Sequence, residues 1–113
     1  MNGKSFEMIP RDVPKVNTKY RSIVTPIPVP ESLSVIEDLR KHEAISMSGQ
    51  PLVVWDHAEG ANVYDKYGNK WIDFSSGVMI ANVGHGNPEV CEAVRQAYPD
   101  IPAPGGEILV QNN

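Results

Sequence analysis

The sequence has little cysteine, no long apolar run and no apolar leader at its start. Cys91 is the only cysteine, so no disulfide can form within the chain, and a reducing compartment is the simpler context. We interpret Cys91 as a small structural residue on a helix. The first 15 residues lack the apolar core of a signal peptide, and no segment approaches the roughly 18 apolar residues of a membrane span. These absences predict a soluble cytoplasmic protein with no membrane partner.

The sequence also lacks an excess of basic residues. Its ten Lys and Arg residues are scattered, and the formal net charge is −4 at pH 7. Proteins that bind nucleic acids usually carry a basic stripe on one face or helix. We therefore expect no nucleic-acid partner.

Several motifs that would indicate a ligand are missing as well. No glycine-rich turn ends in Lys-Ser or Lys-Thr, as a phosphate-binding loop requires. The sequence around Gly84 and Gly86 has the wrong glycine spacing for a dinucleotide fingerprint, and no parallel βαβ pattern surrounds it. The residues that could hold a metal are dispersed: His42, His57, His85 and Cys91. A metal site needs several ligands at suitable spacing, so we predict none.

What is present indicates one small α+β domain. The 113 residues are 41% hydrophobic and 21% charged, which is not the composition of a disordered chain. Residues 1–30 contain five of the ten prolines, and each proline fixes φ and removes an amide donor. We predict an extended arm over 1–30 without a helix or a central strand. The apolar residues between its prolines suggest that the arm lies along another surface, such as that of a second subunit.

After the arm, the patterns predict a helix, a three-stranded antiparallel meander and a second helix. Pro30 and Glu31 suit the first turn of a helix over 31–43. Runs rich in Val, Trp, Tyr, Ile and Phe at 52–56, 61–65 and 70–74 predict the strands, with Gly68 at a positive φ in the second turn. Asn87 as N-cap and Pro88 at N1 begin the second helix, which Pro99 ends. Residues 99–113 are predicted to be an irregular tail, in which 107–110 could form a strand.

The candidate catalytic side chains have stronger structural interpretations. His85 could act as a general acid or base, but a histidine between two glycines can also bond the backbone and fix the turn, which we favour. Ser75 and Ser76 could be nucleophiles, yet no histidine–carboxylate pair is placed beside them by sequence, and strand-end serines are the simpler interpretation. Lys66 and Lys70 flank a hairpin turn, where lysines are normally solvated. We therefore assign no catalytic residue to this chain.

Residues 77–86 carry the most informative pattern. The glycines allow a positive φ or close approach of the backbone to a ligand or another chain. Between Gly77 and Asn82 lies the apolar run VMIA, which is too apolar to be left in water. A segment of this kind fits either a subunit interface or the wall of a ligand pocket, and these residues alone do not separate the two.

The order of these elements resembles the N-terminal segment of class III aminotransferases, the pyridoxal-phosphate enzymes that include acetylornithine, ornithine and 4-aminobutyrate aminotransferases. That family shows an extended arm and short helix, a meander, a Ser-Gly turn with a short apolar run, and an Asn-x-Gly-His-x-x-Pro motif before a helix. The resemblance covers roughly residues 30–97. The matching positions are Gly60, Val63, Asp65, Gly68, Trp71, Ile72, Asp73, Phe74, Ser76, Gly77, Val78, Asn82, Gly84, His85 and Pro88.

The resemblance implies a fragment of a fold type I enzyme that works as a homodimer, with each active site at the subunit interface. Residues 31–98 would be the N-terminal part of the small domain. The cofactor lysine and phosphate-binding turn would belong to the large domain, so pyridoxal phosphate is not expected to bind this chain alone. Position Val78 would line the substrate pocket with Gly77 and Met79 beside it. A further set would shape the turn and helix start near the dimer contact: Asn82, Gly84, His85 and Pro88.

The implied reaction is amino transfer from a donor, one with a terminal amine, to a 2-oxo acid. Related enzymes on the same scaffold are mutases, racemases and decarboxylases, and the fold does not separate these chemistries. The tail 99–113 departs from the family, in which the helix continues into the large domain, so we expect a truncated or trimmed product that is inactive alone. The alternative is a stand-alone, non-catalytic β-meander that acts as an interaction module.

Overall fold

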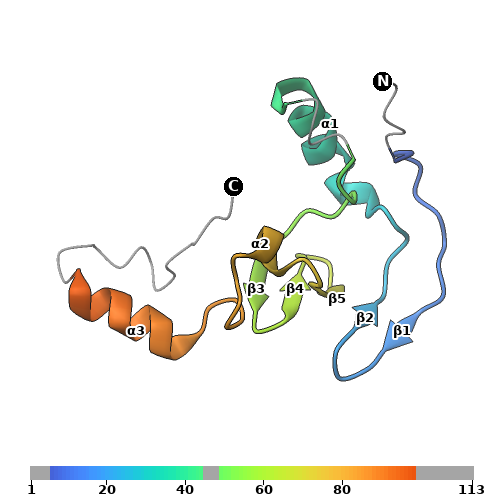
Figure 1. The fold of residues 1–113 in the computed structure, drawn as a ribbon. Coiled ribbons are helices and arrows are strands. Elements are labelled where there is room, and N and C mark those ends of the chain that lie inside the picture. The colour runs from blue at the N-terminus through green and yellow to red at the C-terminus, as the bar shows by residue number, and fades with distance from the viewer. Residues whose placement is uncertain (1–5, 45–48, 99–113) are drawn as a thin grey trace.

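The computed structural model describes residues 6–44 and 49–98, which are organised around one antiparallel sheet (Figure 1). The sheet has five short strands in the order β1-β2-β5-β4-β3. The strands are β1 (Val16–Asn17), β2 (Ser22–Ile23), β3 (His57–Glu59), β4 (Asn62–Tyr64) and β5 (Lys70–Ile72). The helices are η1 (Pro30–Ser32), α1 (Leu33–His42), α2 (Ser76–Met79) and α3 (Pro88–Ala97). This is the α+β arrangement that the sequence predicts.

Two strands of the N-terminal arm, β1 and β2, belong to this sheet, which corrects the prediction that residues 1–30 form no central strand. That the arm lies along another surface stays a prediction. β1 pairs with β2, and Ser22 of β2 pairs with Lys70 of β5, so β2 lies inside the sheet. The reason is the placement of the prolines. Residues 15–25 contain none, so their amides remain available for pairing.

The meander of β3, β4 and β5 confirms the predicted topology, but its first strand is displaced along the chain. The sequence predicts a strand at 52–56, whereas the strand is His57–Glu59, and the two-residue turn at 60–61 sets its register with Glu59 opposite Asn62. Residues 52–54 instead line a cleft against α1. These residues border the cleft and do not pair in the sheet, so the prediction of a strand there was wrong.

The predicted helix over 31–43 is confirmed as η1 followed by α1. Pro30 is the first residue of η1, where its missing amide costs no hydrogen bond. Ile36 is the one buried residue of α1, whereas Val35 and Leu39 are 45% and 42% exposed. α1 is thus buried at Ile36 alone, and the rest of its apolar face stays exposed in the described residues.

The centre of the fold is held by a polar residue as much as by apolar ones. The buried apolar side chains of the described ranges are Ile23, Val29, Ile36 and Val63, and Asn69 is only 1% exposed. The Asn69 Oδ1 accepts from the amides of Val24 and Thr25 at 2.8 and 3.3 Å. Its Nδ2 donates to Thr25 Oγ1 and Asp65 Oδ2, each at 2.7 Å. Asn69 therefore joins the β4–β5 turn to the arm.

The turn before β5 has the predicted positive φ at Gly68, with a value of 91°. An added Cβ at Gly68 would lie 3.3 Å from Val24 Cγ2, so a side chain is disfavoured by conformation and by space. The Asp65 Oδ1 accepts from the amides of Tyr67 and Asn69, both at 2.9 Å. The turn is thus closed by its own side chains.

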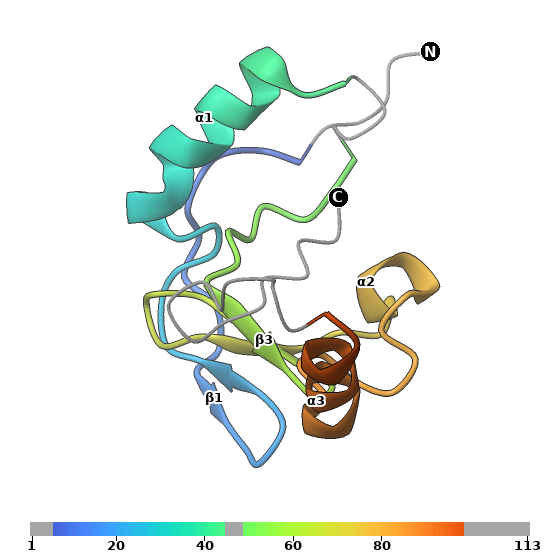
Figure 2. The ribbon, with the colours of Figure 1, turned by 90° about the vertical axis from the view of Figure 1, so that its left-hand side faces the viewer.

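α3 lies away from α1 in both views of the ribbon (Figures 1 and 2). Its predicted start is confirmed, because the Asn87 side chain accepts from the amides of Glu89 and Val90. No residue of α3 is buried.

The radius of gyration is 16.1 Å, against about 13 Å for a compact domain of this length, which agrees with elements that spread rather than close around one core. None of the helices in the described residues has the length and apolar character that crossing a membrane requires.

Candidate functional site

The segment with the most unusual backbone is α2, within the loop 74–83. Ser76, Val78 and Met79 have φ values of 51°, 62° and 66°, and Gly77 between them has 57°. Four consecutive residues therefore adopt the left-handed conformation. The turn is closed by backbone bonds from Met79 N to Ser75 O at 2.7 Å and from Ile80 N to Ser76 O at 2.9 Å.

This conformation is costly for three of the four residues. A left-handed turn brings Cβ close to the following carbonyl oxygen, at roughly 1–2 kcal/mol for each residue other than glycine. The three non-glycine residues together then cost about 3–6 kcal/mol. Val78 is β-branched, for which a positive φ is especially rare. Such strain persists only where the surrounding contacts determine the backbone, and it is concentrated at functional sites.

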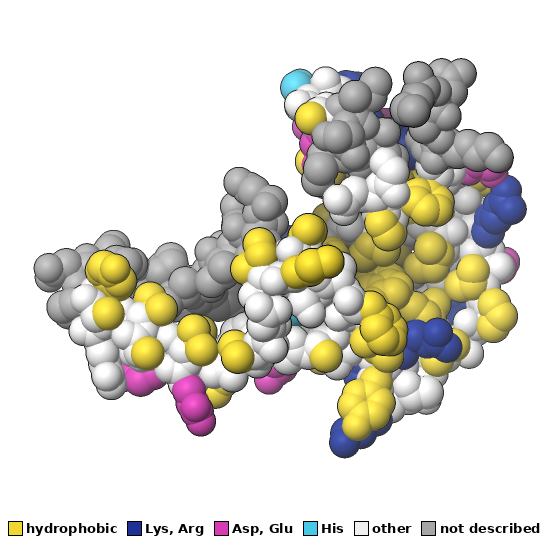
Figure 3. Space-filling model, in the orientation of Figure 1, with side chains coloured by type: hydrophobic (Ala, Val, Ile, Leu, Met, Phe, Trp, Pro, Cys, Tyr) yellow, Lys and Arg dark blue, Asp and Glu magenta, His cyan; other side chains and the backbone are white. Residues whose placement is uncertain are grey.

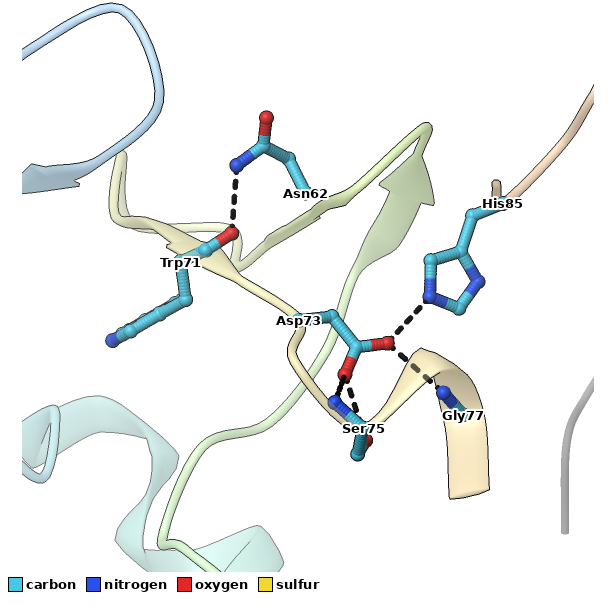
Figure 4. A network of polar contacts seen from close by, with 6 residues as sticks. All are labelled: Asn62, Trp71, Asp73, Ser75, Gly77 and His85. Carbon is cyan, nitrogen blue, oxygen red and sulfur yellow. Dashed lines mark hydrogen bonds and ion pairs between the residues drawn. The ribbon is translucent and has the colours of Figure 1, made fainter. Parts of the chain in front are cut away.

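Asp73 supplies those contacts (Figure 4). Its Oδ1 accepts from the amide of Ser75 at 2.9 Å and from the Ser75 hydroxyl at 2.7 Å. Its Oδ2 accepts from the amide of Gly77 at 3.0 Å and lies 2.7 Å from Nε2 of His85. One carboxylate at the end of β5 thus binds the start of α2 and a histidine twelve residues further along the chain.

The charge of Asp73 is stabilised by these partners. Burial raises the pKa of the Asp73 carboxyl, but hydrogen bonds from the Ser75 and His85 side chains and from the Gly77 and Ser75 amides outweigh it, and the pKa falls from 3.8 to about 2. Asp73 is therefore ionised at neutral pH and can only accept hydrogen bonds. It follows that the Nε2 of His85 carries a hydrogen and donates a hydrogen bond to Asp73.

His85 is itself fixed to the sheet. Its amide donates to Gly60 O at 2.8 Å, and its carbonyl accepts from Gly60 N at 2.9 Å. The Trp55 ring meets the His85 ring edge-on, with centroids 5.8 Å apart. Gly84 has a φ of 92°, and an added Cβ there would lie 3.1 Å from Gly60 Cα, so both conformation and space favour glycine at this close approach.

The Asp73–His85 pair is an anchor rather than an exposed acid–base pair. The side chains of His85 and Asp73 are only 10% and 5% exposed. Ser75 uses its hydroxyl on Asp73 and does not lie beside an activating base. This arrangement can hold a proton at His85 Nε2 and orient the backbone, but it presents no nucleophile.

The residues predicted to line a substrate pocket occupy very different environments. Gly77 is buried, whereas Val78 and Met79 are 74% and 83% exposed. Phe74, at 91%, is exposed on the same loop, as are Ile80 and Val83. Figure 3 shows hydrophobic side chains gathered over α2 and along α3. The structure therefore places an apolar, outward-facing edge at the predicted position, without an opposing wall in the described residues.

The residues predicted to shape the turn and interface lie close together in the chain but have different structural roles. The Asn82 amide donates to Ile80 O at 2.9 Å, and the Gly84 amide donates to Ala81 O at 2.9 Å. Pro88 is the first residue of α3. Val90 and Val94 of α3, 48% and 37% exposed, leave its apolar stripe uncovered by the described residues. Their part in an interface stays a prediction.

A separate cleft of about 400 Å³ lies between α1 and residues 50–54. Its lining includes Ile36, Leu39, Leu52 and Val54. No residue of the loop 74–83 contributes to it. The cleft is therefore not the predicted substrate wall, and it contains no residue that the sequence singles out for chemistry.

The lysines of the described ranges do not fit the role of a cofactor-binding lysine, which needs a desolvated pocket. None of the five is buried: Lys15, Lys19, Lys41, Lys66 and Lys70. Lys70 Nζ donates to Lys19 O at 2.8 Å, and Lys66 is 74% exposed. No step involving pyridoxal phosphate can be assigned to these residues.

Sequence reasoning missed the central role that Asp73 plays in this site. The spacing of Asp73 and Ser75 is that of an Asx turn, which would have indicated the first contact. Nothing in the spacing indicates that His85 returns to the same carboxylate, because that contact depends on the bridge between Gly60 and His85.

Comparison with known proteins identifies the family of the chain. The family model of class III aminotransferases matches residues 44–102, just over half of the chain. The loop, the anchor and α3 all fall within the match. This chain belongs to the class III aminotransferase family.

Individual relatives are similar over about half of the chain. The acetylornithine aminotransferase of Clostridium acetobutylicum is 38% identical over 58 residues, which are 51% of this chain and 15% of the relative. That of Methanocaldococcus jannaschii is 39% identical over 59 residues, 52% of this chain and 15% of the relative. The probable 4-aminobutyrate aminotransferase of Bacillus subtilis is 38% identical over 52 residues, 46% of this chain and 12% of the relative. The chain thus spans only a small part of these relatives' length. No solved structure matches it significantly.

Proposed function

We propose that this chain is the N-terminal part of a pyridoxal-phosphate-dependent aminotransferase that moves an amino group from a donor with a terminal amine to a 2-oxo acid. The family membership supports an aminotransferase. Two names among the relatives, acetylornithine and 4-aminobutyrate aminotransferase, support the donor class, because both compounds carry a terminal amine. We extend the proposal to a fold type I homodimer in the cytoplasm, in which residues 31–98 begin the small domain.

The observation that carries the proposal is the exposed edge of α2. Val78 and Met79 are 74% and 83% exposed, although the backbone that carries them is bound to Asp73, whose side chain is only 5% exposed. An apolar edge on a fixed backbone is suited to line an apolar part of a substrate pocket, while Gly77 lets the backbone approach. We propose that Gly77, Val78 and Met79 form this wall in the complete enzyme.

The remaining loop residues are proposed to support the dimer contact. Asn82, Gly84, His85 and Pro88 shape the chain between α2 and α3. The uncovered stripe of α3 is consistent with burial against a part of the enzyme outside this chain, because exposed apolar faces of this kind mark interaction surfaces.

Pyridoxal phosphate supplies an electron sink when it is bound to such an enzyme. None of the described lysines is buried, so the cofactor is proposed to be held by other parts of the enzyme. The isolated chain is therefore expected to be inactive. Transamination of acetylornithine or 4-aminobutyrate by the purified 113-residue chain with added cofactor would contradict this expectation.

A chimera tests the pocket wall directly. Residues 44–102 would replace the matching segment of the Clostridium acetobutylicum relative, and kcat/KM would be measured for the amine donor. Truncation of Val78 or Met79 to alanine should lower kcat/KM by about tenfold or more, since a lost apolar contact in a pocket costs about 1–3 kcal/mol.

Ile72→Ala is the matched control, because Ile72 is an exposed apolar residue of β5 outside the loop. It should leave kcat/KM within about twofold, as for surface substitutions. An active chimera in which Val78→Ala and Met79→Ala behave like Ile72→Ala would overturn the proposed wall.

The alternative of a stand-alone interaction module predicts a closed monomer without an exposed apolar patch. Phe74 at 91% exposure and the outward side chains of α2 do not fit that expectation, and the family membership does not favour it. Size-exclusion chromatography and dye binding separate the alternatives. Weak dye binding by a monomer would favour the module.

A further inference from the structure

The conformation of α2 depends on contacts from outside the turn. Within the described residues, the one side-chain hydrogen bond to the backbone of α2 is that from the Gly77 amide to Asp73 Oδ2, at 3.0 Å. The other bonds of the turn run between its own backbone groups and Ser75. A left-handed turn of non-glycine residues is not favoured locally, so its hand must be selected by such an external contact.

We propose that Asp73 and His85 are positioning residues that hold α2 in its left-handed conformation and thereby set the direction in which Val78 and Met79 project. The significance for a substrate wall rests on the proposed function. The conformational claim itself concerns only this chain and can be tested without cofactor or substrate.

The contacts form a continuous path from the sheet to α2 (Figure 4). Gly60, in the turn between β3 and β4, exchanges two backbone hydrogen bonds with His85. His85 Nε2 lies 2.7 Å from Asp73 Oδ2, and the same oxygen accepts from the Gly77 amide. The second oxygen, Oδ1, binds both polar groups of Ser75. The two oxygens thus bind different donors, and the carboxylate cannot rotate without breaking a hydrogen bond.

His85 restricts the carboxylate in a way that Ser75 cannot. Ser75 is two residues from Asp73 and moves with the same loop, whereas His85 is fixed to the turn at Gly60. A bond to His85 therefore fixes the orientation of the Asp73 carboxylate relative to the sheet. Reversal of the hand of α2 would redirect the Cα–Cβ bonds of Val78 and Met79, because side-chain direction follows φ and ψ.

The test is nuclear magnetic resonance on the complete 113-residue chain. In a residue with a φ near +60°, the amide and Hα protons lie close together and give a strong intraresidue nuclear Overhauser cross-peak. We expect this cross-peak at Val78 and Met79. Asp73→Asn and His85→Ala should remove these cross-peaks. They should also raise the hydrogen-exchange rate of the Gly77 amide by about ten- to hundredfold, the range expected when a bond to a charged acceptor is lost.

A conservative variant separates positioning from a general loss of structure. His85→Gln retains a side-chain donor and should restore the cross-peaks at least in part, whereas His85→Ala should not. Cross-strand contacts between Val63 and Trp71, which face each other in β4 and β5, report whether each variant remains folded. His42→Ala is the matched control, because His42 is bound to an aspartate on the exposed side of α1. It should change none of these signals.

The proposal is overturned if Val78 and Met79 keep their positive φ in His85→Ala while the β4–β5 contacts persist. It is also overturned if the cross-peaks are absent from the unsubstituted chain, or if His85→Gln behaves like His85→Ala. Because no readout involves amino transfer, failure of the proposed function would leave these outcomes unchanged.

Discussion

Replacement of Asp73 by asparagine should destabilise the chain by an amount that depends on pH. The substitution keeps the size of the side chain and removes its charge. One oxygen remains to accept from Ser75, but the new amide group would take the place of Oδ2 and face both the Gly77 amide and the Nε2–H of His85, which are donors. The variant therefore loses charge-assisted bonds and leaves two donors, on Gly77 and His85, without their acceptor.

The magnitude follows from the pKa of Asp73, which is lowered from 3.8 to about 2. Since one pKa unit corresponds to about 1.4 kcal/mol, the ionised carboxylate contributes about 2 kcal/mol to the folded state. The folded pKa is depressed, so this contribution is present above the unfolded pKa and is lost as the pH falls from about 4 to about 2. The asparagine variant has no such group and should not show this loss.

Urea unfolding followed by tryptophan fluorescence measures the difference. At pH 6 the free energy of unfolding should fall by about 2 kcal/mol in Asp73→Asn, and most of the difference should be gone at pH 2. Asp38→Asn is the control, because Asp38 lies beside His42 with 72% of its side chain exposed. It should change stability by less than about 0.5 kcal/mol. A difference for Asp73→Asn that is equal at both pH values would refute the electrostatic reasoning.

Three further substitutions test other parts of the structure. Asn69→Ala removes the side chain that joins the β4–β5 turn to the arm and should lower the free energy of unfolding by about 2–4 kcal/mol. Hydrogen exchange at the Val24 amide should become faster, and equal exchange would contradict the assigned bonds. Gly84→Ala should cost at least about 1 kcal/mol by thermal unfolding, because it meets backbone at 3.1 Å with a positive φ, whereas Gly49→Ala has open space and should be neutral. Asn87→Ala should lower the helicity of α3 by circular dichroism and cost about 1 kcal/mol, and unchanged helicity would show that the cap is dispensable.

The elements that could be predicted were those with local causes. Pro30 begins η1, and Gly68 takes a positive φ between β4 and β5, because each residue's own backbone preference decides the structure there. The strand predicted at 52–56 failed because an apolar run does not reveal its partner. Those residues line the cleft beside α1, while the more polar His57–Glu59 forms the strand. The prediction for the tail 99–113 lies outside the described residues.

The candidate site divides in the same way. The sequence by itself determined the family pattern, the apolar run after Gly77 and the start of α3 at Asn87, because these depend on residue type and short spacing. The tertiary structure alone decided that β2 joins β5, that α2 is left-handed and that His85 returns to Asp73. These features depend on contacts between residues distant in the chain, whose gain must exceed the local preference for another conformation. For α2, the contacts of the Asp73 carboxylate oppose the ordinary right-handed preference of three residues, and no local pattern in the sequence shows that His85 joins those contacts.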